Sequence, residues 1–331
     1  MNLALVIPVR NDQSNLNRLL TQVGDMDIFD QVIVVDDASD PPVTVPDRLP
    51  GSRKCPVQLI EQEIAGGAGA ARNRAIPEIR TDHVIFFDSD DLFTPDFVPL
   101  WQSLKEQDFD FCLFRYHDTE RGYYGGQGQI PHDEACWRLA GINPGISSVQ
   151  TVSEDGIWAL AEASNFPWNK IYCSSFLRAH GLRCTEIPVH NDIELHWRSF
   201  LVAKRILVSN HIAAMHVVRP NGTRLTNRRN AERLRVFEAL TQVANCIARQ
   251  DPSPRATLAF LRFTSGLLVW IHQVIEESLR MDLHTRTRAF LDDTLGPETF
   301  ADLTHSDPVL ALQLSLQMSL TPPPVAVAAS C

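Results

Sequence analysis

Apolar runs separated by stretches of helical periodicity fill the first 116 residues. The apolar runs predict buried strands over 3–8, 31–35, 57–61, 83–87 and 109–116. Between them, apolar residues at helical spacing predict helices over 15–23, 66–77 and 95–106. Strands that alternate with helices are typical of an open α/β sheet. We therefore predict an α/β fold with an open, mainly parallel sheet flanked by helices.

The pattern loosens after residue 116 and becomes purely helical near residue 230. The middle region predicts a glycine-rich loop over 122–128, helices over 153–163, up to Gly181 and over 192–203, and strands over 206–208 and 213–218. The last region predicts helices over 231–249, 255–280 and 283–295. Residues 258–271 are apolar on more than one face, which is typical of a buried helix, a dimer contact or a membrane-surface element. We favour a packed helical subdomain.

Composition and charge exclude several classes of protein. The 331 residues are 44% hydrophobic and 21% charged, as in ordinary globular proteins, and the formal net charge of -10 argues against a nucleic-acid partner. Seven scattered cysteines without Cys-x-x-Cys spacing predict reduced thiols. The chain begins with a strand-like run instead of a signal peptide, and no apolar run reaches the roughly 18 residues of a membrane span. These features predict a cytoplasmic protein.

Acidic residues follow two of the predicted strands. Asp88, Asp90 and Asp91 come directly after residues 83–87, and Asp36 and Asp37 end the strand over 31–35. Such clusters repel themselves unless a cation or a ligand lies among them, and the carboxyl ends of parallel strands open onto the ligand crevice of an α/β sheet. The alternative for the first cluster is that one of its acids caps the helix that starts near Pro95.

The glycine-rich turn over 66–73 invites a nucleotide-binding interpretation. A dinucleotide fingerprint does not fit, because Arg72 stands where a third Gly or Ala is needed, and a phosphate loop would require Gly-Lys-Ser/Thr. Arg72 is instead suited to donate to a diphosphate, with a solvated surface arginine as the alternative.

Four segments in register resemble the family 2 glycosyltransferases of the GT-A fold. They are Ile7-Pro8-Val9-Arg10-Asn11, Val34-Val35-Asp36-Asp37-Ala38-Ser39, Gly69-Ala70-Ala71-Arg72-Asn73 and Phe87-Asp88-Ser89-Asp90-Asp91. The resemblance is strongest over 1–115 and extends to about 226. It implies a GT-A domain over 1–226, with a nucleotide-sugar half over 1–116 and an acceptor half over 117–226. A helical subdomain over 227–320 and a disordered tail over 321–331 would follow.

The resemblance implies a donor site and a metal site. Asp36 and Asp37 would bind the ribose and base, with Asp37 accepting from a uracil N–H. Asp88 and Asp90 match the Asp-x-Asp motif that binds Mg²⁺ or Mn²⁺ beside the diphosphate. Arg10 stands where the family often has a base-stacking Tyr, which leaves the choice of base less defined. The implied donor-binding residues are Pro8, Arg10, Asp36, Asp37, Arg72, Asp88, Ser89 and Arg219.

The general base is assigned by position. Asp192 occupies the second place of the family's acidic pair before a helix, with Asn191 replacing the first acid. A base that takes the proton of an acceptor hydroxyl in a single displacement would invert the anomeric centre. Glu194 is the rival base, and Asp192 as a mere helix cap is the alternative.

Three further segments resemble parts of the family. Trp168, Asn169 and Lys170 resemble an acceptor-side segment of bacterial surface-polysaccharide glycosyltransferases, with core packing as the alternative. Arg219 follows the closing strand and could clamp the diphosphate. His216 is a candidate further metal ligand, although a single strand histidine is more often a core residue.

These expectations define the leading hypothesis. It is a metal-dependent, inverting glycosyltransferase that uses Mn²⁺ or Mg²⁺ and moves a sugar from a nucleotide sugar, a UDP-sugar by the resemblance, to a glycan or lipid-linked acceptor. The alternatives are a nucleotidyltransferase or an NAD-dependent oxidoreductase on a similar sheet, and a non-catalytic nucleotide-sugar-binding protein. Peripheral attachment at the inner face of the membrane and a homodimer through the carboxyl-terminal helices both stay open.

Overall fold

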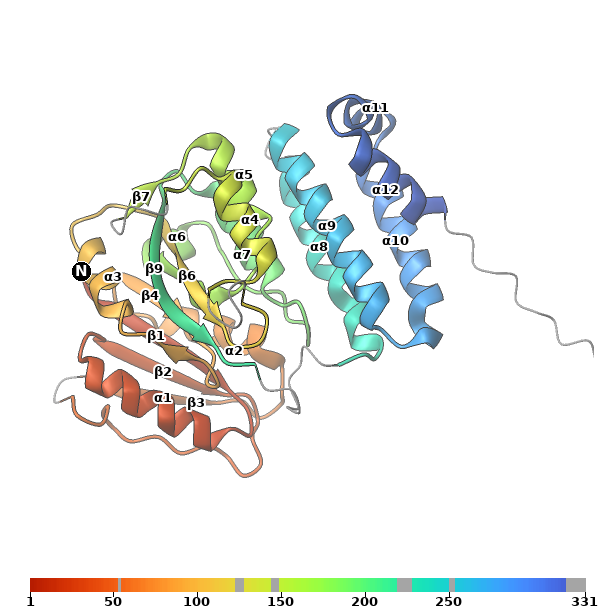
Figure 1. The fold of residues 1–331 in the computed structure, drawn as a ribbon. Coiled ribbons are helices and arrows are strands. Elements are labelled where there is room, and N and C mark those ends of the chain that lie inside the picture. Colours follow the sequence, from red (N-terminus) through yellow and green to blue (C-terminus); the bar gives the residue numbers. More distant parts are fainter. Residues whose placement is uncertain (53–54, 123–127, 144–148, 219–227, 250–253, 320–331) are drawn as a thin grey trace, which may run out of the picture. The chain divides into compact units, whose positions relative to one another are not determined.

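The computed structural model describes all residues except 53–54, 123–127, 144–148, 219–227, 250–253 and 320–331 (Figure 1). The chain forms two compact units, Met1–Thr223 and Arg224–Cys331. The tail expected over 321–331 therefore lies outside the described residues, as does most of the loop expected over 122–128.

The first unit is built on one mixed, mainly parallel sheet. Its described strands are β1 (Leu3–Val9), β2 (Gln31–Asp36), β3 (Val57–Glu61), β4 (His83–Phe86), β5 (Leu92–Phe93), β6 (Phe111–Asp118), β7 (Gln150–Thr151), β8 (Lys170–Cys173) and β9 (Ile206–His216). They lie in the order β3-β2-β1-β4-β8-β6-β9-β5, and β7 pairs with β9. β1, β2, β3 and β4 run parallel, as do β6 and β9, whereas β8 lies antiparallel between β4 and β6. The α/β class and the mainly parallel sheet are confirmed.

Helices flank this sheet. The described α-helices of the first unit are α1 (Gln13–Met26), α2 (Gly67–Ala75), α3 (Phe97–Leu104), α4 (Pro131–Leu139), α5 (Glu154–Ala161), α6 (Ser174–Ala179) and α7 (Ile193–Val202). α1 buries one stripe of apolar side chains at helical spacing, Leu16, Leu19, Leu20 and Val23, which join the same core as the apolar faces of β1 and β2.

An aromatic cluster holds the acidic turn after β4 in place. The rings of Phe87 and Phe93 are stacked with centroids 3.8 Å apart, and the centroids of Phe93 and Phe97 are 4.4 Å apart. All three side chains are buried. Because Phe87 precedes the turn and Phe93 follows it, both ends of the acidic turn are anchored in the core.

The second unit is helical. It contains α8 (Val236–Arg249), α9 (Pro254–Val274), α10 (Arg280–Thr294), α11 (Pro297–Ser306) and α12 (Pro308–Ser319), with 3₁₀ turns at Ala231–Arg235 and Glu277–Leu279. α9 contains the apolar stretch 258–271 and contacts α8, α10 and α12. Within the described part of the chain, no helix combines the length and the apolar character needed to cross a membrane.

Several expected boundaries were wrong. The strands expected over 206–208 and 213–218 are one strand, β9. The helix expected over 255–280 ends at Val274, and α10 begins at Arg280 instead of residue 283. Sequence reasoning also missed short or late elements, namely α4, β5, β7, β8, α11 and α12.

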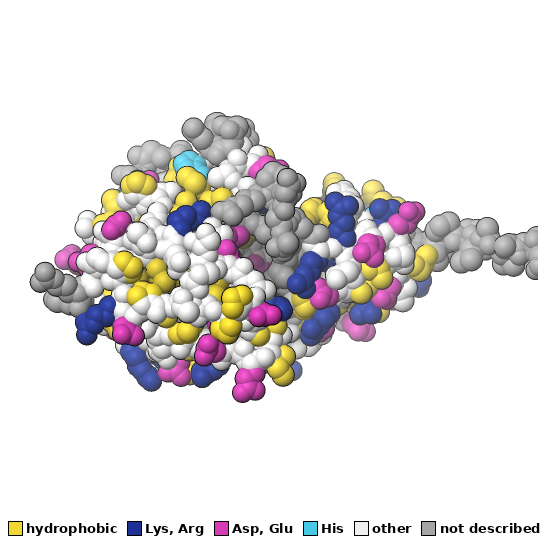
Figure 2. All heavy atoms as spheres, turned by 90° about the horizontal axis from the view of Figure 1, so that it is seen from below, with side chains coloured by type: hydrophobic (Ala, Val, Ile, Leu, Met, Phe, Trp, Pro, Cys, Tyr) yellow, Lys and Arg dark blue, Asp and Glu magenta, His cyan; other side chains and the backbone are white. Residues whose placement is uncertain are grey.

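Acidic and basic side chains are interspersed on the face drawn in Figure 2. The surface charge seen there is therefore mixed, in keeping with a chain that has 30 Lys and Arg against 40 Asp and Glu.

Candidate functional site

The loops after β1 and β2 are joined by hydrogen bonds. Pro8 is buried within β1, and Arg10, directly after the strand, is exposed. Asn11 has a left-handed backbone with φ of 53°; its N–H donates to Ser39 Oγ (2.8 Å). Its Oδ1 accepts from the N–H of Asp40 (2.7 Å). These bonds fix the two loops relative to each other at the carboxyl ends of β1 and β2.

The acids at the end of β2 are buried and bind backbone N–H groups. Asp36 accepts from the N–H groups of Ser39 (3.0 Å) and Val43 (2.9 Å), so it shapes its own loop. Asp37 accepts from the N–H groups of Gly66 (2.6 Å) and Gly67 (2.9 Å), at the amino terminus of α2. A carboxylate there also interacts favourably with the helix dipole. The expected contacts of both acids with base and ribose stay predictions.

Arg72 joins two separate parts of the site. It lies on α2 and is only 3% exposed. Its Nη2 donates to Asp88 Oδ1 (2.5 Å) and its Nη1 to Asn191 Oδ1 (2.9 Å). Burial lowers the pKa of the guanidinium, but the neighbouring acidic groups, Asp88 foremost, together outweigh burial and raise it above the usual range. The alternative of a solvated surface arginine is wrong.

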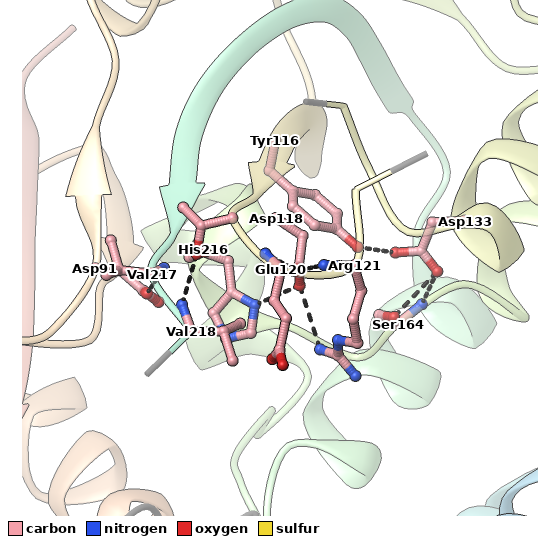
Figure 3. A network of polar contacts seen from close by, with 11 residues as sticks. Asp91, Tyr116, Asp118, Glu120, Arg121, Asp133, Ser164, His216, Val217 and Val218 are labelled. Atoms are coloured by element: carbon pink, nitrogen blue, oxygen red, sulfur yellow. Dashed lines mark hydrogen bonds and ion pairs between the residues drawn. The ribbon is translucent and has the colours of Figure 1, made fainter. Parts of the chain in front are cut away.

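The acidic turn after β4 does not serve to cap a helix. β5 follows it, and α3 begins only at Phe97 with Asp96 as its N-cap. The Asp88 side chain is 32% exposed, whereas Asp91 is buried and accepts from the N–H of Val217 (3.0 Å) (Figure 3). The main-chain oxygen of Asp90 accepts from Arg18 Nη2 (2.8 Å). This turn is thus attached to the end of β9 and to α1.

Ser89 lies in the same turn. It is buried, and its Oγ donates to Asp12 Oδ2 over 3.4 Å. Asp12 stands just before α1 and also accepts from the side chain of Asn15 (2.8 Å). The expected contact of Ser89 with the donor stays a prediction.

His216, at the end of β9, is held by a buried carboxylate that sequence reasoning missed. Its Nδ1 lies 2.9 Å from Asp118 Oδ2, and Asp118 also accepts from the N–H of Arg121 (2.6 Å) (Figure 3). Burial raises the pKa of Asp118, but these bonds outweigh it and hold the pKa well below the usual range. Asp118 follows the strand predicted over 109–116, and an acid after a strand was the signal that could have found it.

The predicted acceptor-side residues lie in the core. Trp168 is buried, and its ring stacks on Phe166 with centroids 4.5 Å apart and on His216 with centroids 5.5 Å apart. Lys170 is fully buried; its Nζ donates to the main-chain oxygen of Phe166 (2.6 Å) and to Asn169 Oδ1 (2.8 Å). Burial lowers the pKa of Lys170 to about 7. Core packing, the alternative that the sequence left open, describes all three residues.

Asp192 stands at the N-cap position of α7, but its side chain makes no capping hydrogen bond. Burial raises the pKa of its carboxyl to about 6, although the charge of Arg72 acts in the opposite direction. The rival Glu194 is engaged on both oxygens, by Thr185 Oγ1 (2.8 Å) and Arg198 Nη1 (2.9 Å). Asp192 as a mere cap is therefore wrong, and its environment is that of a group whose pKa is tuned.

Comparison with known proteins identifies the domain. Residues 4–158 match the model of the family described as Glycosyl transferase family 2. The amino-terminal part of this chain belongs to that family. The family predicted from the sequence is confirmed, and the chain carries a glycosyltransferase domain.

Two relatives match parts of this chain. Over 89 residues the chain is 38% identical to the pre-mycofactocin glycosyltransferase of Mycobacterium tuberculosis, covering 27% of this chain and 18% of that protein. Over 199 residues it is 26% identical to EpsH of Bacillus subtilis (strain 168), whose name describes it as a glycosyltransferase, covering 58% and 52%. The chain therefore spans about a fifth and about half of the lengths of these relatives.

Solved structures share the fold. Residues 1–349 of S. aureus TarS in complex with UDP-GlcNAc superpose with a TM-score of 0.71 at 16% identity, covering 96% of this chain and 88% of that one. The complex of the same protein with UDP gives a TM-score of 0.69 at 17% identity, covering the same shares. The GT-A type of fold is confirmed.

The family 2 domain offers carboxylate oxygens for a divalent cation. Asp88 and Asp90 present such oxygens in one turn, the ligand type that Mg²⁺ and Mn²⁺ prefer. The adjacent bond of Asp91 to Val217 brings this turn beside His216. Among the described residues, no three His, Cys, Asp or Glu side chains gather as a metal site. Asp88 and Asp90 would suit such a cation only if a bound group, such as a diphosphate, supplied further oxygen ligands. Arg219 lies outside the described residues.

Proposed function

We propose that this protein is a metal-dependent, inverting glycosyltransferase that moves a sugar from a nucleotide sugar to a hydroxyl group of a glycan or lipid-linked glycan. The observation that carries the proposal is the state of Asp192. This carboxyl does not cap its helix and has a pKa raised to about 6. Through Arg72 and Asn191 it is connected to Asp88 of the acidic turn. The proposed base thus directly follows Asn191, which Arg72 links by hydrogen bonds to the proposed donor-side carboxylate, Asp88.

The donor we propose is a UDP-sugar. TarS, which shares the fold, has been crystallised with UDP-GlcNAc and with UDP. Arg10 is exposed at the carboxyl end of β1 and could stack on the base. Asp37 would bind the base or ribose through the carboxylate lone pairs that its bonds to the N–H groups of Gly66 and Gly67 leave.

Asp192 would act on the acceptor. It takes the proton from the acceptor hydroxyl as that oxygen forms a bond to the anomeric carbon. The bond between the anomeric carbon and the diphosphate oxygen breaks on the opposite face, so the configuration inverts. Asp88 and Asp90 would hold Mg²⁺ or Mn²⁺. The role of His216 as a further ligand stays a prediction, because the three described side chains do not gather as a metal site. When bound, this cation offsets the charge that builds on the departing nucleoside diphosphate.

We also propose a cytoplasmic location. Attachment at the inner face of the membrane, or a homodimer through the carboxyl-terminal helices, stays a prediction that flotation with vesicles and sedimentation would test.

Nucleotide titration tests the proposal. We expect UDP to bind in isothermal titration calorimetry and Mn²⁺ to strengthen its affinity, whereas GDP and NAD bind more weakly. NAD binding that needs no metal would favour the oxidoreductase alternative, and a folded protein that binds no nucleotide would contradict the proposal.

A pair of variants tests the metal site. Asp90→Ala should remove the effect of Mn²⁺ on UDP affinity. Asp302→Ala, which changes an exposed acid on α11, should leave that effect intact. An undiminished effect of Mn²⁺ in Asp90→Ala would show that Asp90 does not hold the metal.

A further inference from the structure

We propose that Arg72 is a positioning residue, whose guanidinium fixes the loop that carries Asp192 relative to Asp88. This inference rests on the function proposed above. It assigns Arg72 a role within the protein, in place of the direct contact with the donor diphosphate that the sequence suggested.

The contacts of the guanidinium support this role. Arg72 Nη2 donates to Asp88 Oδ1 (2.5 Å) and Nη1 to Asn191 Oδ1 (2.9 Å), and the residue is 3% exposed. Asp88 belongs to the turn after β4, whereas Asn191 directly precedes Asp192. The two acceptors, Asp88 and Asn191, are therefore 103 positions apart in the sequence. The planar fork of an arginine can donate to both at once, which the single nitrogen of a lysine cannot do in the same geometry.

The rest of α2 is fitted to the same loop. Asn73 exchanges two hydrogen bonds with Cys184: its Nδ2 donates to the main-chain oxygen (2.9 Å), and its Oδ1 accepts from the N–H (2.8 Å). The loop closes on itself where the N–H of Thr185 donates to the main-chain oxygen of Asn191 (2.9 Å). α2 therefore holds one end of the loop through Asn73 and the other end through Arg72.

Close packing leaves the loop little freedom to shift. A Cβ added at Gly69 would lie 2.7 Å from the main-chain oxygen of Thr185 and 2.8 Å from Asn191 Cβ. The backbone of α2 thus also touches the loop, at Thr185 and Asn191. A loop held at three places along one helix presents the next residue, Asp192, in a fixed place.

The charge of Arg72 also acts on the base. Among its described contacts, the guanidinium donates to one carboxylate, that of Asp88, since Asn191 is a neutral acceptor. The positive charge opposes the effect of burial on Asp192 and so favours the carboxylate form that a base needs. Arg72→Lys keeps the positive charge but not the paired hydrogen bonds, whereas Arg72→Met removes both. Comparing the two variants therefore separates the effect of the hydrogen bonds from the effect of the charge.

Three measurements test the inference. The variants are Arg72→Lys, Arg72→Met and Asn191→Ala, with Arg74→Lys as a matched control, since Arg74 lies on the same helix with a half-exposed side chain. We would measure UDP affinity by calorimetry, amide hydrogen exchange of residues 184–192, and the pH dependence of UDP release from UDP-GlcNAc with water as acceptor.

We expect Arg72→Lys and Asn191→Ala to speed amide exchange in the loop about tenfold or more, to slow UDP release about tenfold, and to leave UDP affinity within about threefold. Arg72→Met should in addition move the acidic limb of the rate profile to higher pH by about one unit. The double variant Arg72→Lys/Asn191→Ala should be no slower than either single variant, because both break one link. Arg74→Lys should change none of these quantities.

Two results would overturn the inference. One is a tenfold or larger loss of UDP affinity in Arg72→Lys with unchanged exchange in the loop, which would make Arg72 a donor-contact residue. The other is a rate of UDP release in the double variant that is reduced by the product of the two single reductions. Failure of the proposed function is seen separately, because the unchanged protein would then bind no UDP. If it binds UDP but releases none from UDP-GlcNAc, loop exchange and affinity alone decide the inference.

Discussion

Asp192 shows how a residue can occupy a structural position without having a structural role. Aspartate is a preferred N-cap residue because its side chain can accept from the first N–H groups of a helix. At α7 the side chain makes no such bond, and the carboxyl instead has a pKa raised by burial to about 6. Burial makes this carboxyl costly to keep ionised and so raises its affinity for a proton, which suits a group that must accept one.

The raised pKa of Asp192 predicts a pH profile. A base acts only when deprotonated, so kcat/KM should rise as pH increases through about 6 and level off above it. Asp192→Asn should lower the plateau rate above pH 6 by about 10² to 10⁴ and remove the rise near pH 6, while UDP affinity is kept. Rates of UDP release from pH 4.5 to 8.5 check this. Glu194→Gln is the comparison, and a larger loss of rate in that variant would move the role of base to Glu194.

Lys170 leads to a prediction of a different kind. Its fully buried ammonium donates two hydrogen bonds, so Lys170→Ala should destabilise the fold by about 2–4 kcal/mol, through lost packing and unpaired acceptors. Unfolding in urea measures this. Lys105→Ala, at an exposed lysine, should stay within about 0.5 kcal/mol of the original protein. Unchanged stability in Lys170→Ala together with a higher KM for the acceptor would instead support the acceptor-side role.

At the scale of residues, the sequence predicted which acids gather but not what each one binds. The apolar runs before Asp36 and Asp88 placed both at the carboxyl ends of strands, where the structure has them. The partners came from far away in the chain: Asp37 binds the amino terminus of α2, and Asp118 binds His216. Such pairings depend on long-range packing, which no local pattern encodes.

At the scale of elements, α2 is the helix on which the site depends. Its predicted start at the glycine-rich turn was close to the observed start at Gly67. Two glycines of this segment are needed for different physical reasons. Gly67 has φ of 85°, a left-handed conformation that suits glycine, whereas Gly69 permits close contact with Thr185 and Asn191. The sequence showed that the turn was special, but the purpose of Gly69 appears only when the loop over 184–191 is in place.

The close contact at Gly69 can be tested. Gly69→Ala adds a methyl group within 2.7 Å of a backbone oxygen, so α2 and the loop must move apart. We expect a loss of UDP release of about tenfold or more, because a shift of the loop displaces Asp192. Gly266→Ala, in α9, has nothing within 4 Å of the new methyl group and should stabilise the protein by up to about 1 kcal/mol without changing the rate. Full activity in Gly69→Ala would show that the loop tolerates displacement.

The elements that sequence analysis missed share a cause. β1, β2 and β4 are continuous apolar runs and could be predicted, whereas β8 has four residues and follows a 3₁₀ turn at Pro167–Asn169. β8 is a strand because it pairs antiparallel with β4 and β6. β4 ends 84 residues before β8 begins, and β6 ends 52 residues before it. A short segment whose conformation is set by its neighbours in space carries little signal of its own.

At the scale of the whole molecule, the residues proposed to bind the donor and to act as base all lie within the first unit, Met1–Thr223. The core that contains β1, β2, α1 and the aromatic residues after β4 also lies there, with members from Leu3 to Ala214. The second unit has buried apolar residues of its own, such as Leu240 and Leu291. Each unit therefore has the hydrophobic core that an independently folding domain requires.

This division predicts that nucleotide binding does not need the second unit. A chain shortened to residues 1–226, the boundary predicted from the sequence, should fold cooperatively and bind UDP within about twofold of the full chain, because the proposed donor residues and their supporting contacts are retained. Circular dichroism and thermal unfolding establish that it folds, and calorimetry with UDP and Mn²⁺ gives the affinity. A shortened chain that folds but binds UDP tenfold more weakly would show that the helices from α8 to α12 contribute to the donor site, and one that does not fold would refute the domain boundary. Asp90→Ala in the shortened chain is the matched control, since it should lose the effect of Mn²⁺ there as in the full protein.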